Sequence, residues 1–228
     1  MRETKPVLLS WSSGKDSSWT LHRLQADPDY EVVGLMTTFN KAADRVAMHA
    51  VRRQLAIAQA AALELPLWQV DLPWPCSNVD YEAIMKDVTI KAEDRGITHI
   101  AFGDLYLEDI RSYREKQLAA SDLRPIFPLW QPDGGTRVLA RQMIAAGLKA
   151  TVTCVDPKQL SPDFLGRRFD AEFLSDLPDT IDPCGENGEF HTFCSDGPSF
   201  LRPVPFQLGE CIERDGFCFQ DLLIADET

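Results

Sequence analysis

Short apolar runs alternate with segments of helical spacing along the first part of the chain. An apolar run beginning at Pro6 predicts a strand, which is followed by a polar loop and a helix that opens into residues 20–24. Further β-rich apolar runs predict strands at residues 31–39, 67–72, 98–103 and 124–127. Helices are predicted over residues 48–65, from Asn78 or Asp80 to Asp94, and over residues 109–121.

This alternation predicts an α/β fold with a Rossmann-like parallel sheet and helices on both of its faces. Ligands of such sheets bind beyond the carboxyl ends of the strands. That edge of the sheet would carry the loop at residues 12–17, Thr37 and Thr38, Asp71, and Gly103 with Asp104. We therefore expect the functional site at this edge.

The pattern changes after residue 130. Turn-forming residues fill positions 131–135, and the following segments predict a helix at 136–146 and a strand at 150–155. Prolines interrupt most of the remainder, and residues 200–225 predict short strands joined by a turn at Asp215 and Gly216. We expect a first domain over residues 1–130 and a smaller C-terminal α/β lobe over residues 131–228, packed over the binding edge.

The polar loop after the first strand combines several groups that bind anions. Its serines, Ser12, Ser13, Ser17 and Ser18, offer hydroxyl donors, and Lys15 offers a positive charge. The start of the next helix adds free backbone N–H groups and the positive end of the helix dipole. This combination fits a phosphate, most commonly that of a nucleoside triphosphate. The spacing around Gly14 is not the Walker pattern, and a serine-capped helix without a ligand is the alternative interpretation.

A second candidate segment runs from Gly103 to Glu115. Asp104 follows a predicted buried strand, where its carboxylate could bind the Mg²⁺ that accompanies a triphosphate. Arg111 and Arg114 lie three residues apart on the next helix and could both face a phosphate or a carboxylate. The alternative is a set of ion pairs on a solvated helix face, which we favour for Glu108, Glu115 and Lys116.

A third candidate segment is Cys184–Phe193. Glu186 and Glu189 stand three residues apart among glycines and are followed by His191. Such groups could bind ammonium, orient a substrate or move protons. A tight turn with solvated acids is the alternative. For the nearby pair Arg167 and Arg168, we favour an exposed surface position over binding of an anionic substrate.

Composition narrows the function classes. The 228 residues carry a formal net charge of −12 and have a pI of about 4.7, which argues against a broad nucleic-acid surface but allows a local nucleotide site. The six cysteines include no C-x-x-C pair, and the sequence opens without a secretory leader or an apolar run of membrane-spanning length. We expect reduced thiols and a cytoplasmic protein that does not enter the membrane. Homo-oligomerisation is left open.

Four segments together carry a family resemblance. The loop at 12–17 resembles the Ser-Gly-Gly-x-Asp-Ser signature of the PP-loop ATP pyrophosphatases. Together with Gly103-Asp104…Ser112-x-Arg114, Pro128-Leu129-Trp130 and Gly185–Thr192, it resembles the diphthine–ammonia ligase family over nearly the whole chain. The resemblance implies a PP-loop ATP-binding domain over residues 1–130 and a C-terminal substrate lobe over 131–228. It further implies ATP-dependent amidation, in which a carboxylate attacks the α-phosphate of ATP, pyrophosphate leaves, and ammonia then displaces AMP.

The candidate residues acquire roles from this resemblance. The residues predicted to bind nucleotide are Ser12, Ser13, Gly14, Lys15, Asp16, Ser17, Ser18, Thr37, Gly103 and Arg114. Those predicted to act in catalysis are Lys15, Asp16, Glu186, Glu189 and His191, and those predicted to bind Mg²⁺ are Asp16 and Asp104. The partners implied are ATP, ammonia and a carboxylate whose identity the sequence leaves open. Ser13 departs from the general pattern because it replaces a glycine, so a positive φ there would be strained.

Two other functions compete with this interpretation. A tRNA-modifying PP-loop enzyme often uses a reactive cysteine and a basic RNA surface, and the cysteine spacing and negative charge argue against both. A PP-loop protein that binds nucleotide as a sensor, without turnover, could keep the Glu186, Glu189 and His191 cluster for ligand contact. Formation of AMP that depends on a carboxylic acid would distinguish the ligase from the sensor.

Overall fold

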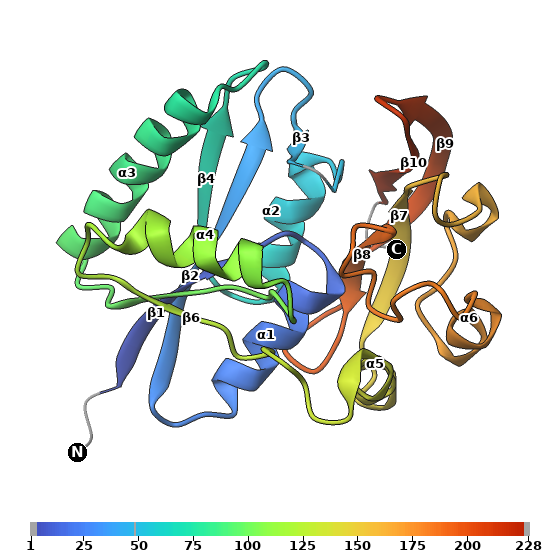
Figure 1. Ribbon diagram of the computed structural model, residues 1–228, viewed down its shortest axis with the longest axis horizontal. Helices are drawn as coiled ribbons and strands as arrows, with labels where there is room; N and C mark the ends of the chain where they lie inside the picture. The colour runs from blue at the N-terminus through green and yellow to red at the C-terminus, as the bar shows by residue number, and fades with distance from the viewer. Residues whose placement is uncertain (1–3, 48, 226–228) are drawn as a thin grey trace.

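A predominantly parallel sheet forms the first half of the protein in a computed structural model that describes residues 4–47 and 49–225. Its strands are β1 (Lys5–Ser10), β2 (Tyr30–Asn40), β3 (Arg45–Val46), β4 (Leu67–Leu72), β5 (His99–Ala101) and β6 (Arg124–Ile126). The parallel strands lie in the order β4-β2-β1-β5-β6, and short β3 pairs antiparallel with the end of β2. Figure 1 shows β4 and β2 side by side at one edge of this sheet. The chain therefore reverses its direction across the sheet between β1 and β5, which is where ligands of such sheets bind.

Alternating apolar residues of β1 anchor the helices on the two faces of this sheet. Val7 and Leu9 pack with the apolar side of the helices that follow β1 and β3, whereas Leu8 packs with the helices on the opposite face. All three side chains are fully buried. The α/β class with a parallel sheet covered on both faces is confirmed.

Four helices belong to this first unit. They are α1 (Lys15–Gln25), α2 (Arg53–Ala62), α3 (Asn78–Asp94) and α4 (Glu108–Leu118). The cap of α3 is Ser77, whose hydroxyl accepts from the Asp80 N–H at 3.1 Å, while the Asp80 carboxylate reaches back to the Ser77 N–H. The prediction that Asn78 or Asp80 is the cap was therefore wrong by one position, although Asp80 does belong to the capping box.

The second helix is shorter than its apolar spacing predicts. It was expected over residues 48–65; Met48 lies outside the described residues, and α2 begins only at Arg53. Ala50 has φ of 56°, which a right-handed helix does not tolerate, and Arg45 and Arg52 pair across the turn as an isolated bridge. Residues 49–52 are thus a tight turn that returns the chain from β3.

The second half of the protein is built on an antiparallel sheet. Its strands are β7 (Lys149–Val155), β8 (Phe190–Asp196), β9 (Phe206–Arg214) and β10 (Phe217–Ile224), in the order β8-β7-β10-β9. Its helices are α5 (Gly135–Ala145), the 3₁₀ turn η1 (Pro162–Phe164) and α6 (Ala171–Asp176). The hairpin between β9 and β10 turns at Asp215 and Gly216 as expected, whereas β8 and α6 were not predicted.

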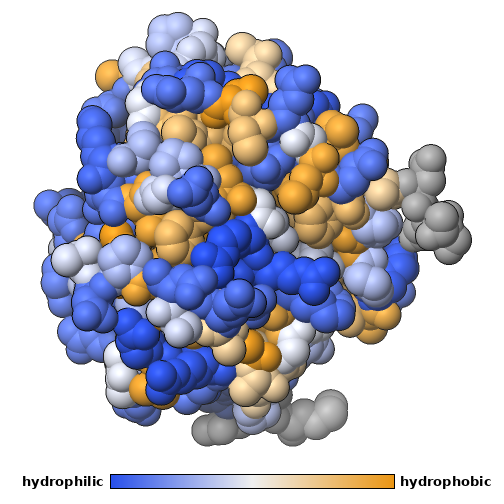
Figure 2. All heavy atoms as spheres, turned by 90° about the vertical axis from the view of Figure 1, so that its right-hand side faces the viewer, coloured by the Kyte–Doolittle hydropathy of each residue, from blue (hydrophilic) through white to orange (hydrophobic). Residues whose placement is uncertain are grey.

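Shared apolar clusters join the two units, which lie side by side in Figure 1. Trp19, Leu105 and Leu129 of the first unit belong to the same buried cluster as α5, β7 and α6. On the face of the second unit seen in Figure 2, apolar residues lie in separate groups among hydrophilic ones rather than in one continuous patch. Within residues 4–47 and 49–225, we find no helix with both the length and the apolar character needed to cross a lipid bilayer.

Candidate active site

The loop between β1 and α1 turns sharply at Ser13. This residue has φ of 70°, a left-handed conformation that suits glycine better than serine, as the sequence departure suggested. Its carbonyl oxygen accepts hydrogen bonds from the N–H of Cys194 (2.8 Å) and from the side-chain amide of Gln59 (3.0 Å). The strained turn is therefore held by β8 of the second unit and by α2 of the first.

Gly14 follows at the N-cap of α1, where space is limited. A Cβ at this position would stand 3.2 Å from the carbonyl oxygen of Thr192 and 3.4 Å from the ring of His49. The Ser17 hydroxyl donates to the Gly14 carbonyl at 3.0 Å, and the Ser12 and Ser17 hydroxyls lie 3.3 Å apart. Glycine thus lets β8 approach the start of α1 closely, and the Ser12 and Ser17 hydroxyls converge there.

The side chain of Lys15 enters the second unit. Its ammonium is buried, donates to the carboxylate of Asp16 at 2.8 Å and donates to the backbone carbonyl of Cys184. It also lies 5.3 Å from the ring centre of Phe190. Burial lowers the pKa of Lys15, but Asp16 and the neighbouring acidic groups outweigh it, so the net pKa is raised and the group remains charged.

Asp16 and Asp104 each have one buried carboxylate oxygen without a hydrogen-bond partner, namely Oδ1 of Asp16 and Oδ2 of Asp104. Burial raises the pKa of Asp104 against the opposing charge of Arg114, and the charge of Asp16 raises it further. The backbone of Gly103 brings the two acids together, because a Cβ there would lie 3.2 Å from the carbonyl carbon of Asp16. Two carboxylate oxygens that accept no hydrogen bond fit a cation, although the described residues contain no group of three or more potential metal ligands.

The two arginines of α4 point to different places. Arg114 lies 3.8 Å from the Asp104 carboxylate and over the ring of Phe102, so it faces the site. Arg111 instead pairs with Glu115 at 2.8 Å and lies over Phe127 and Trp130. The ion-pair interpretation that we favoured for Glu115 therefore agrees with its contacts.

The segment from Cys184 to Glu189 closes over the loop. Gly185 has φ of 69°, and a Cβ there would lie 2.7 Å from the carbonyl oxygen of Phe190, so only glycine fits this turn. The carboxylate of Glu186 accepts from the N–H groups of Leu105 (2.7 Å) and Tyr106 (3.4 Å), which follow β5. Burial raises the pKa of Glu186 to about 7 although these hydrogen bonds oppose the shift.

Glu189 has a different environment from Glu186. It is almost completely buried, and its Oε1 accepts from the Asp182 N–H (2.9 Å) and the Asn187 amide (3.0 Å). Glu189 lines neither of the two cavities at the carboxyl ends of β1 and β5. The contacts of Glu189 therefore shape the 182–189 turn.

A pair of histidines lies beside the loop. The rings of His191, on β8, and His49, in the turn before α2, have centres 4.4 Å apart. Burial lowers the pKa of His191 to about 4. The pKa of His49 is also lowered, well below its ordinary value, by burial and by the nearby His191 and Lys15. His49 was not among the predicted site residues, because the apolar spacing placed it inside the predicted helix over residues 48–65. In the sequence, it could have been suggested only as a polar residue that follows a predicted strand of the sheet.

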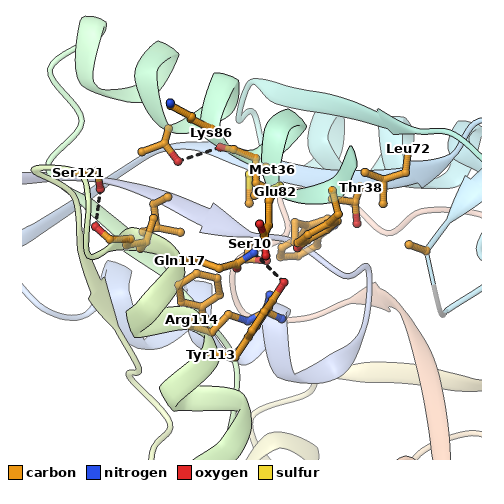
Figure 3. A pocket seen from close by; sticks show the side chains of 18 of the residues that line it. Ser10, Met36, Thr38, Leu72, Glu82, Lys86, Tyr113, Arg114, Gln117 and Ser121 are labelled. Carbon is orange, nitrogen blue, oxygen red and sulfur yellow. Dashed lines mark hydrogen bonds between the residues drawn. The ribbon is translucent and has the colours of Figure 1, made fainter. Parts of the chain in front are cut away.

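Two cavities meet at the carboxyl ends of β1 and β5. The smaller, of about 230 Å³, is lined by the β1–α1 loop, Gly103, Asp104, Arg114 and the Cys184–Thr192 segment. The larger, of about 940 Å³, opens between α3 and α4, where Glu82, Lys86, Tyr113, Arg114 and Gln117 face it (Figure 3). The residues common to both linings are Ser10, Ser12, His49, Phe102 and Arg114.

Most of the predicted site residues line these cavities, but Ser13, Gly14, Ser18, Thr37 and Glu189 line neither of them. Thr37 is buried and donates to the carbonyl oxygen of Trp11 at 2.7 Å, whereas its neighbour Thr38 lines the larger cavity. Asp71 pairs with Arg53 at 2.6 Å, and Arg167 pairs with Asp176 at 2.7 Å. None of these four charged groups lines either of the two cavities.

Comparisons with known proteins agree on one family. Residues 5–125 match the diphthamide synthase N-terminal domain, and residues 135–214 match the diphthamide synthase C-terminal domain. A diphthine–ammonia ligase of Rattus norvegicus is 24% identical over 230 residues, which cover 91% of this chain and 85% of that protein. Those of Mus musculus and Homo sapiens are 27% and 26% identical over 149 residues, covering 63% of this chain and 55% of each relative. In these two comparisons the chain spans about half the length of the relative.

Proposed function

The chain belongs to the diphthamide synthase family, and from this membership we propose that it is an AMP-forming carboxylate–ammonia ligase. ATP activates a carboxylate with release of pyrophosphate, and ammonia then converts the activated acid to an amide. The observation that carries the proposal is the meeting of three segments distant in sequence at one small polar cavity beside a larger one. These segments are the β1–α1 loop, Gly103-Asp104 and Cys184–Thr192.

The smaller cavity suits the phosphates of ATP. The start of α1 supplies the positive end of a helix dipole, and the Ser12 and Ser17 hydroxyls converge beside it. Lys15 uses two of its three N–H donors on Asp16 and Cys184, which leaves one for a phosphate oxygen. Arg114 lines both cavities and adds a second cation.

The Mg²⁺ that accompanies ATP fits the two carboxylate oxygens that accept no hydrogen bond, Oδ1 of Asp16 and Oδ2 of Asp104. These two residues would hold it, and the bound ion would reduce the negative charge on the phosphates. Arg114 stands beside Asp104 and would keep its carboxylate oriented.

In the first step a carboxylate oxygen attacks the α-phosphorus. A bond forms between that oxygen and phosphorus, the bond from phosphorus to the bridging oxygen breaks, and pyrophosphate leaves with the electron pair. The chain would contribute by holding both reactants in line and by stabilising charge on the leaving group, a role that Lys15, Arg114 and the α1 N–H groups would fill.

The larger cavity suits adenosine together with the acid that is activated. Its volume of about 940 Å³ and mixed lining of Met36, Leu72, Tyr113, Glu82 and Lys86 offer apolar walls with a few polar contacts. The relatives are named for diphthine and ammonia, and we propose diphthine as the first acid to test. The contacts of Glu186 with Leu105 and Tyr106 would close the cavities from the side of the second unit.

The test is pyrophosphate release from ATP by the full chain, measured with diphthine and with a panel of carboxylic acids, each with and without ammonium chloride. We expect acid-dependent formation of AMP and of the amide. Asp16→Asn should lower the rate by at least a hundredfold. Because Lys15 is buried against Asp16, Lys15→Gln is expected to lose stability as well as rate, and Ser17→Ala provides a milder second test of the loop.

Circular dichroism and thermal unfolding establish that each variant is folded. An unchanged rate in folded Asp16→Asn and Ser17→Ala would contradict the assigned phosphate site. Nucleotide binding without acid-dependent AMP would instead support the sensor, and tight tRNA binding at physiological salt would support the RNA-modifying enzyme.

A further inference from the structure

His49 stands where the two cavities meet. It lines both of them and packs beside Gly14 at the start of α1. In the proposed function the phosphates occupy the smaller cavity and the activated acid extends into the larger one. The bond between acyl oxygen and α-phosphorus then lies at this junction, so His49 is beside the atoms that react.

One ring nitrogen of His49 is free. Nδ1 is buried and has no hydrogen-bond partner, and the backbone of Thr192 lies beside the ring and raises the pKa of His49. A backbone group that raises a histidine pKa is an acceptor for the ring, so we place the hydrogen of the neutral ring on Nε2. In a neutral imidazole the other nitrogen keeps its lone pair. Nδ1 is therefore an unused proton acceptor.

The surroundings keep this acceptor uncharged. The titratable groups around the ring are His191 of β8 and Lys15 of α1. Burial and both of these neighbours lower the pKa of His49, so the imidazole is neutral at pH 7. The ammonium of Lys15 is already bonded to Asp16 and Cys184 and is not a base.

The backbone of His49 is fixed from several sides. Its carbonyl accepts from the Thr153 hydroxyl at 3.5 Å, a weak contact from β7, and its N–H donates to the Ala47 carbonyl at 2.8 Å. Arg45 donates to the Ala50 carbonyl at 2.8 Å and to Asp221 of β10 at 2.7 Å. The second unit thus holds the turn that carries His49, as positioning of a catalytic group requires.

We propose that His49 is a further catalytic residue of this site and accepts the proton that ammonia loses when it attacks the acyl-adenylate. This inference rests on the proposed function. The ammonia nitrogen forms a bond to the acyl carbon, the bond between that carbon and the AMP oxygen breaks, and AMP leaves with the electron pair. The proton moves from nitrogen to Nδ1 of His49, which gives the amide, AMP and an imidazolium that returns its proton to solvent.

His191, the histidine that the sequence suggested, fits this role less well. Among the histidines of the described residues, His49 is the one with a buried ring nitrogen that lacks a partner. It also lines both cavities, whereas His191 lines only the smaller of them. His191 instead packs against the ring of His49 at 4.4 Å and keeps it in place.

The experiment follows the two half-reactions separately in His49→Gln, His49→Ala and the control His22→Gln, which alters a histidine on α1 away from both cavities. Each protein is given ATP and either diphthine or the panel acid that the wild type uses. Single-turnover formation of AMP-linked acid reports the first step, and mass spectrometry of the amide formed with ammonium chloride reports the second. Imidazole is added to His49→Ala as a replacement base.

We expect His49→Gln to form the adenylate within about threefold of the wild-type rate and to form the amide about 10²–10⁴ times more slowly, the range for a lost general base. Imidazole should restore part of the rate in His49→Ala, and His22→Gln should match the wild type. An amide rate in His49→Gln equal to the wild type overturns the role of His49. Equal loss of both steps without imidazole rescue assigns His49 a structural role and also overturns it. A wild type that forms no AMP with any acid overturns the proposed function, and this inference with it.

Discussion

The side-chain amide of Gln59 donates a 3.0 Å hydrogen bond to the carbonyl oxygen of Ser13 and thereby ties α2 to the strained turn of the β1–α1 loop. The same amide donates to the Cys194 carbonyl at 2.6 Å, and its oxygen accepts from the Trp11 indole at 2.9 Å. Gln59 is fully buried, and its hydrogen bonds connect α2 to the β1–α1 loop and to β8. The geometry of the candidate phosphate site therefore depends on a residue that does not line it.

Gln59→Leu should lower the free energy of unfolding by about 3 kcal/mol, because it leaves buried polar groups of Trp11 and Cys194 without this partner. Denaturant unfolding followed by circular dichroism measures the loss. Gln54→Leu is the matched control, since Gln54 lies exposed on the same helix and its replacement should change stability by no more than about 0.5 kcal/mol. Equal effects of the two substitutions would show that the buried amide has no special role.

Ser13→Gly should raise the free energy of unfolding by about 1 kcal/mol. Serine is strained at φ of 70°, and its buried hydroxyl has no partner, whereas glycine adopts this conformation freely. Ser18→Gly, in the regular part of α1, should instead destabilise the protein, because glycine is a poor helix former. Thermal and denaturant unfolding of both variants give the comparison, and a loss of stability in Ser13→Gly would contradict the strain.

The pKa of Glu186, raised by burial to about 7, makes stability depend on pH. Between about pH 4.5 and pH 7 the unfolded chain has lost this proton while the folded chain retains it, so the contribution of Glu186 to stability falls as pH rises through this window. The slope is at most about 1.4 kcal/mol per pH unit. In Glu186→Gln this part of the slope should disappear, which unfolding measurements at pH 5, 6, 7 and 8 can detect. Parallel curves for the two proteins would exclude the shift.

Asp221 links the sheet of the second unit to the turn before α2. It accepts from Arg45 at 2.7 Å and from Arg52 at 2.6 Å. Burial alone would raise the pKa of Asp221, but the hydrogen bonds and charges of Arg52 and Arg45 together outweigh it and lower the pKa to about 2. Its contribution to stability is present above about pH 4 and is lost as pH falls toward 2. Asp221→Asn should lower the free energy of unfolding by about 2 kcal/mol at pH 7.

The same substitution should loosen the turn that carries His49. Hydrogen exchange at residues 49–53 is expected to become faster in Asp221→Asn, while exchange in β6, at the opposite edge of the parallel sheet, stays unchanged. Asp215→Asn is the control, because Asp215 lies exposed in the β9–β10 turn. Unchanged exchange at residues 49–53 would mean that other contacts hold this turn.

The sequence predicted most of the parallel sheet because its strands are local apolar runs. The predicted strand at residues 67–72 coincides with β4, and the strand, loop and helix after Pro6 coincide with β1 and α1. The segments that the sequence grouped as candidates, around Lys15, Asp104 and Glu186, do line one cavity. The sequence could assign these segments to one site because each follows a predicted strand or lies in a glycine-rich turn, and such segments gather at the carboxyl edge of the sheet.

What the sequence could not predict depends on contacts between distant residues. The turn at residues 49–52 interrupts an apolar spacing that looks helical, and it is stabilised by Arg45 and Asp221 rather than by its own residues. The sequence did not predict strand β8, because both faces of this strand are largely buried and its apolar and polar residues therefore do not alternate in a simple way. Thr37 and Thr38 could not be distinguished, since their roles depend on which face of the sheet meets the cavity.

The cluster that contains Trp19, Leu105 and Leu129 has a consequence for dividing this protein. A chain cut between Leu129 and Gly134 would leave part of this apolar cluster exposed on each fragment. Neither fragment would fold stably by itself, and each would be prone to aggregate alone. Produced together in one cell, the fragments should find each other and restore the whole, which makes this connection a natural place for a split-protein reporter.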